Sequence, residues 1–145
     1  MAGVVVCHGS ASVRERLVVT SIGVPSLAPV RAAATADELL ALARRIAPTV
    51  VLLDAHLPGA GPAEAIRRLR AVAPSAAVVT LAERPAPDLS TVARLAEERP
   101  DLPQFVMVPE VAGERVPLDR AVHRARTLAG LVHEALAAVA QSSGL

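Results

Sequence analysis

The chain has 145 residues, a formal net charge of +1 and a single cysteine, Cys7. This length suffices for one domain with its own core, and a single thiol excludes an internal disulfide framework. The near-neutral charge provides no global field for nucleic acid or anionic membranes, and no run of about 18 apolar residues predicts a membrane span. We therefore expect a cytoplasmic protein that contacts neither nucleic acid nor membrane directly.

Two compositional biases restrict the chemistry and the core. All 15 basic residues are arginine, so a mechanism that needs an ammonium side chain is excluded. Phe105 is the only aromatic residue, so the core must be built from alanine, valine and leucine.

Short β-branched runs alternate with longer helical patterns, which predicts βαβ units and a parallel sheet. The first half should form a strand at 3–7, a helix at 12–20, a weak strand at 30–34, a helix after Thr35 and a strand at 50–54. Glu38 completes a capping box with Thr35. The second half should form a helix beginning near Pro62, a strand at 77–81, a helix at 89–98, a strand at 105–108 and a long final helix.

The final helix is expected to span 118–139. Its apolar residues have an alternating four-three spacing, which is either the buried face of an ordinary amphipathic helix or a heptad seam for dimerisation. The seam consists of Leu118, Val122, Ala125, Ala129, Val132 and Leu136.

These elements predict an α/β fold of the flavodoxin-like kind, a three-layer sandwich with a five-stranded parallel sheet in the order 2-1-3-4-5 and about five helices. The whole chain, 1–145, is expected to be one domain. Residues 126–140 would form a helical extension that dimerises or connects to an output domain.

Residues 49–70, TVVLLDAHLPGAGPAEAIRRLR, place Asp54 at the end of an apolar strand, before a turn and a helix. This run resembles the centre of bacterial two-component receiver domains, and the resemblance extends topologically over about 3–125. It implies that Asp54 is the candidate phosphoacceptor. It also implies two acidic residues after the first strand that hold Mg²⁺ with the aspartate, a hydroxyl after the fourth strand and a lysine after the fifth.

Most of that set is missing from this chain. Cys7 and His8 stand at the acidic positions, Ala82 stands at the hydroxyl position with Thr80 two residues earlier, and Val108 stands at the lysine position. The sequence therefore predicts a degenerate pocket without bound Mg²⁺ or another cofactor, because thiol and imidazole are poor substitutes for hard oxygen ligands.

Three other interpretations concern Cys7 and the polar residues expected near it. Cys7, His8, Asp54 and His56 could converge on Zn²⁺, but the paired spacing of zinc sites is absent. Cys7 and His8 are poor candidates for a nucleophile and its base, because adjacent strand residues point to opposite faces. A regulatory thiol at Cys7 would require an exposed side chain.

The sequence indicates a non-enzymatic, atypical response-regulator receiver that signals without phosphorylation, forms a homodimer and controls transcription through a partner or output domain. A small-molecule ligand near Asp54 would be a substitute for the phosphoryl group. Two alternatives stay open: a conventional phosphorelay receiver phosphorylated on Asp54, and a small flavodoxin-like ligand-binding protein or enzyme.

Overall fold

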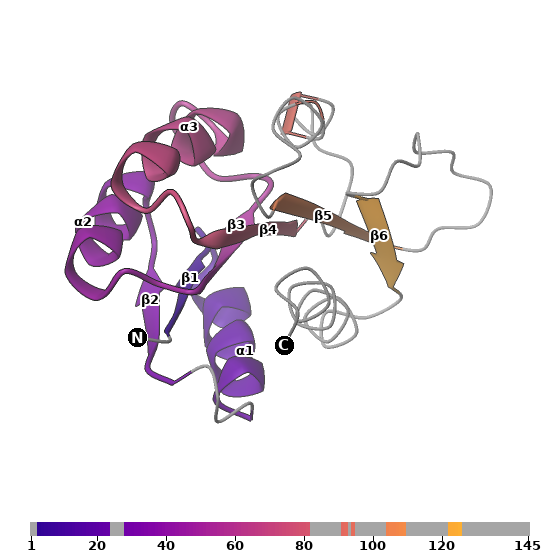
Figure 1. The fold of residues 1–145 in the computed structure, drawn as a ribbon. Coiled ribbons are helices and arrows are strands. Elements are labelled where there is room, and N and C mark those ends of the chain that lie inside the picture. The colour runs from indigo at the N-terminus through magenta and orange to yellow at the C-terminus, as the bar shows by residue number, and fades with distance from the viewer. Residues whose placement is uncertain are drawn as a thin grey trace.

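The computed structural model describes residues 3–23, 28–81, 91–92 and 94, together with the backbones of 104–109 and 122–125. The strands within these ranges form one parallel sheet in the order β2-β1-β3-β4-β5-β6 (Figure 1). They are β1 (Val4–Cys7), β2 (Val30–Ala33), β3 (Val50–Asp54), β4 (Ala77–Leu81), β5 (Gln104–Pro109) and β6 (Val122–Ala125). The predicted flavodoxin-like order of the first five strands is confirmed, and a sixth strand extends the sheet.

Helices cover both faces of the sheet, which gives three layers. Helices α2 (Ala36–Ile46) and α3 (Pro62–Val72) lie on one face, and α1 (Ala11–Ile22) lies on the other (Figure 1). The two faces bury separate cores because successive strand residues point in opposite directions. Leu53 belongs to the core under α2 and α3, whereas its neighbour Leu52 belongs to the core under α1.

The local signals that start two helices lie where the sequence predicts, although Glu38 binds the N–H of Ala34 rather than that of the cap residue Thr35. Thr35 caps α2, since its hydroxyl accepts the Glu38 N–H at 3.2 Å, while the Glu38 carboxylate accepts the Ala34 N–H at 3.0 Å. Pro62 is the first residue of α3, where its missing N–H costs no helical hydrogen bond. These contacts fix where α2 begins after β2 and where α3 begins after β3.

The predicted final helix is wrong over Val122–Ala125, which form β6 and pair in parallel with β5. A short apolar pattern does not separate helix from strand, and the open edge of β5 offers backbone groups that a neighbouring strand can pair. Val122 and Ala125 therefore do not continue a helical seam. The other seam residues, Leu118, Ala129, Val132 and Leu136, and the extension at 126–140 lie outside the described residues.

The predicted helix at 89–98 is described only at Thr91, Val92 and Arg94, which are helical. Within the described part of the chain, no helix combines the length and apolar character needed to cross a membrane.

Candidate functional site

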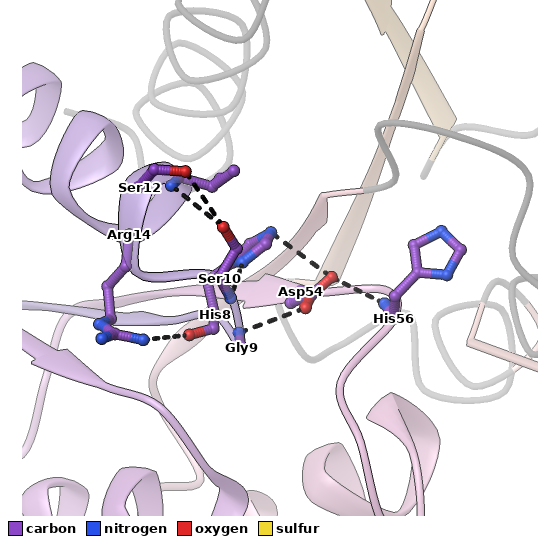
Figure 2. Close-up of polar contacts among 8 residues, drawn as sticks. His8, Gly9, Ser10, Ser12, Arg14, Asp54 and His56 are labelled. Carbon is purple, nitrogen blue, oxygen red and sulfur yellow. Dashed lines mark hydrogen bonds and ion pairs between the residues drawn. The ribbon is translucent and has the colours of Figure 1, made fainter.

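The candidate site lies where β1 and β3 end side by side, since Cys7 pairs with Leu53 in the parallel register. The residues that follow this pair, His8 and Asp54, line a cavity of about 500 Å³. Their side chains point toward one another in Figure 2. Its described lining is His8, Gly9, Ser10, Val13, Asp54, His56 and Pro58. The structure thus brings Asp54 and His8 together, as expected for the carboxyl ends of neighbouring parallel strands.

Asp54 is buried, with 5% of its surface exposed, and backbone donors hold its carboxylate. The His56 N–H donates to Oδ1 at 2.8 Å, and the Gly9 N–H approaches Oδ2 at 3.4 Å (Figure 2). A buried carboxylate needs such donors to offset the loss of water. Asp54 therefore connects the loop after β1 to the turn after β3.

His8 lies against the carboxylate, with its Nε2 3.6 Å from Asp54 Oδ1. The ring is held from the other side, because the Ser10 N–H donates to Nδ1 at 3.0 Å. The Arg14 guanidinium also donates to the His8 carbonyl oxygen at 2.8 Å. One imidazole is thereby fixed between the first turn of α1 and Asp54.

Cys7 points away from this cavity. Its side chain belongs to the core under α2 and α3, and its thiol lies 3.6 Å from the Thr35 carbonyl oxygen. Burial raises the pKa of the Cys7 thiol to about 12, with smaller contributions from the negative charges of Asp54 and Glu38. Such a thiol is protonated and unreactive at neutral pH, which removes the interpretation of Cys7 as an exposed regulatory thiolate.

The orientation of Cys7 also argues against a zinc site. Cys7 faces the opposite side of the sheet from His8, and His56 supplies its backbone N–H while its ring points away from Asp54 (Figure 2). Over the residues that the structure describes, no three histidine, cysteine or acidic side chains are grouped to hold a metal ion.

Thr80 does not supply the missing hydroxyl to this cavity. It pairs with Leu53 in the register, one residue before Asp54, and lies between Val79 and Leu81, which both face the core under α1. Its own side chain therefore points to the opposite face, where its hydroxyl is buried and has no hydrogen-bond partner among the described residues. Ala82 lies outside the described residues. Val108 is in β5, but its side chain is also outside them.

Sequence reasoning missed the groups that complete the pocket. Gly9 contributes only its backbone N–H, and Arg14 binds a backbone carbonyl oxygen. Contacts to the backbone leave no recognisable side-chain motif in the sequence. The available signal was Ser10 immediately before a helical pattern, the position of an N-cap. Ser10 does cap α1, and its backbone N–H also binds His8.

The residues present do not fit the Mg²⁺ that the receiver resemblance implies. Mg²⁺ requires near-octahedral oxygen ligands, whereas the described lining offers one carboxylate and places an imidazole beside it. The two acidic positions carry a core thiol and this imidazole. No metal-dependent step can be derived from such a donor set.

Comparison with known proteins places this geometry in a known fold. No family model matches the chain, and no curated protein matches it either. A receiver domain protein (CheY-like) from Methanospirillum hungatei has a TM-score of 0.69 at 12% identity, with 99% of this chain and 98% of that chain covered. The chain has the receiver fold.

Two further similar structures come from proteins with different names and functions. A LuxR-family two-component response regulator from Aurantimonas is 27% identical, with a TM-score of 0.60 over 72% of this chain and 71% of that chain. An adenylate cyclase from Rhodopirellula baltica has a TM-score of 0.64 at 15% identity, covering 97% of this chain and 91% of that chain. The function must therefore be argued from the pocket rather than from the fold.

Proposed function

We propose that this chain is an atypical two-component receiver module that signals without Mg²⁺-dependent phosphorylation of Asp54. The observation that carries the proposal is the contact between His8 and Asp54, because an imidazole stands where the receiver resemblance requires an acidic metal ligand. Moving a phosphoryl group onto a carboxylate concentrates negative charge, which a metal ion and cationic groups must offset. The described lining of the pocket supplies no such set.

The proposal assigns Asp54 a structural role in the resting domain. Its oxygens accept backbone N–H groups from both flanking loops, so the carboxylate orders the pocket without a metal. A receiver switches by a shift between conformations that already exist, and any ligand or partner with unequal affinity for them can drive that shift. We therefore propose that a partner protein, an output domain or a small molecule at the cavity replaces the phosphoryl group.

Control of transcription through an output domain or a partner is part of this proposal. It is supported by the 27% identity to a two-component response regulator from Aurantimonas. Homodimerisation through the predicted seam is not carried forward, because two of its residues lie in β6.

The alternative is a conventional phosphorelay receiver, and one observation favours it: Asp54 lines an open cavity rather than a closed core. The two functions differ in whether a phosphoryl group becomes attached to Asp54. Intact-mass spectrometry after incubation with acetyl phosphate and Mg²⁺ should show no phosphoryl adduct on the wild type, with Asp54→Asn as the matched control. An adduct on the wild type that the variant lacks would establish phosphotransfer to Asp54 and overturn the proposal.

A further inference from the structure

We propose that His8 is a positioning residue that takes the place of a divalent cation beside Asp54, with its neutral imidazole fixed in the Nε2–H form and that hydrogen directed at the carboxylate. The inference rests on the proposed function, since it concerns the same pocket. It goes further by naming the group that occupies the metal position and the chemical form of that group.

The first step is the bond at Nδ1. The Ser10 backbone N–H donates to His8 Nδ1 at 3.0 Å, and an amide nitrogen cannot accept a hydrogen bond in return. Nδ1 must therefore carry a lone pair and no hydrogen. A neutral imidazole has one N–H, so the hydrogen of His8 is on Nε2.

The second step is the direction of Nε2–H. This nitrogen lies 3.6 Å from Asp54 Oδ1, and His8 and Asp54 are both buried, with 8% and 5% of their surfaces exposed. The distance exceeds that of a direct hydrogen bond, but Nε2 is the ring nitrogen that faces the carboxylate, so the positive end of its N–H dipole lies beside Asp54 (Figure 2). The imidazole therefore supplies part of the positive potential that a cation would provide.

The third step is the exclusion of metal ions. A histidine nitrogen binds a metal through its lone pair, and the Nε2 that faces Asp54 carries a hydrogen instead. Binding of Zn²⁺ at Nε2 would move that hydrogen to Nδ1, against the Ser10 N–H, so this form disfavours joint binding of Zn²⁺ by His8 and Asp54. His8 is held at two points, because the Arg14 guanidinium donates to its carbonyl oxygen and the Ser10 N–H donates to its ring.

Two variants of His8 separate a cation substitute from a merely structural residue. His8→Asp places a second carboxylate beside Asp54 and should create a Mg²⁺ site, since Mg²⁺ is commonly held by one or two carboxylates. His8→Gln retains a neutral N–H donor without a second carboxylate, so it is the matched control. We expect saturating Mg²⁺ to raise the unfolding midpoint of His8→Asp by about 2–5 °C and to leave the wild type and His8→Gln unchanged.

Histidine ¹⁵N NMR on the wild-type chain supplies the second readout and does not depend on how His8→Asp folds. The resonances that disappear in His8→Gln identify His8, and they should show a protonated Nε2 and an unprotonated Nδ1. The reverse pattern, a Mg²⁺ response of the wild type, or a folded His8→Asp that ignores Mg²⁺ would each overturn the inference. A phosphoryl adduct on wild-type Asp54 would instead overturn the proposed function, so the two failures are distinguishable.

Discussion

The carboxyl ends of β1 and β3 lie next to each other in the sheet, and they differ in how closely each follows the receiver pattern. β3 ends in Asp54, which stands at the phosphoacceptor position of the receiver resemblance, and is followed by a turn and α3. β1 ends in Cys7 and is followed by His8, where receivers carry acids. Both strands are fully buried and pair in register. The comparison teaches that apolar strands can maintain the fold while the residues at one strand end depart from the receiver pattern.

The largest effect is expected from the shared scaffold. Leu52 is completely buried in β3, so Leu52→Ala should lower the free energy of unfolding by about 2–5 kcal/mol through lost burial and a residual cavity. Val19→Ala is the control, because Val19 is 70% exposed and should change stability by less than about 0.5 kcal/mol. Urea denaturation followed by circular dichroism suits a chain without tryptophan or tyrosine. Equal effects at the two positions would contradict the assigned core.

The next effect concerns Cys7 and tests whether β1 points its thiol into the core. Folding raises the Cys7 pKa from 9.0 to about 12, so above pH 9 the unfolded chain releases a proton that the folded chain retains. The free energy of unfolding should therefore fall by about 1.4 kcal/mol per pH unit above pH 9, until the pH reaches the folded pKa. The chain has no lysine or tyrosine to titrate in this range.

Urea denaturation of the wild type and Cys7→Ala at several pH values from 9 upward measures this dependence. Because Cys7→Ala lacks the thiol, its stability should have a much flatter dependence on pH. Parallel slopes for the two proteins would show that Cys7 is not the buried group responsible.

A smaller effect is expected at Asp54, where the two strand ends are joined. Asp54→Ala leaves the Gly9 and His56 N–H groups without their acceptor, whereas Asp54→Asn retains one amide oxygen. Asp54→Ala should therefore be about 1–3 kcal/mol less stable than Asp54→Asn in the same denaturation assay. Identical stabilities would mean that the carboxylate does not order the two loops.

The smallest effect is expected at the start of α2, which does not line the pocket. Thr35→Ala removes the hydroxyl that caps the Glu38 N–H and should lower the free energy of unfolding by about 1 kcal/mol. Thr35→Ser retains the hydroxyl and should restore most of that loss. A Thr35→Ser variant as unstable as Thr35→Ala would assign the effect to the methyl group instead.

Much of the fold could be predicted from the sequence because its signals are local. Short stretches of sequence predict these elements: the apolar runs predict β1 and β3, Thr35 predicts the start of α2, and Pro62 predicts the start of α3. β6 could not be predicted in this way, since Val122–Ala125 become a strand by pairing with β5. A contact of that kind is absent from the local pattern.

The pocket was predictable in its position and not in its contacts. Asp54 and His8 follow paired strands, so their proximity follows from topology. The choice of nitrogen that carries the His8 hydrogen depends on the Ser10 backbone N–H, which no side-chain motif records. The suggestion that Thr80 supplies the missing hydroxyl could have been rejected from the sequence, because strand alternation places its side chain on the face away from Asp54.

The most direct test of the central claim, a pocket completed without metal or phosphate, observes the Gly9 and His56 amides. Both N–H groups approach the Asp54 carboxylate, so their NMR resonances report on any group that binds there. We predict that adding Mg²⁺ and beryllium fluoride, a mimic of the phosphoryl group, leaves both resonances in place. Saturable shifts of these two amides, absent in Asp54→Asn, would contradict the account and identify a working phosphoryl site.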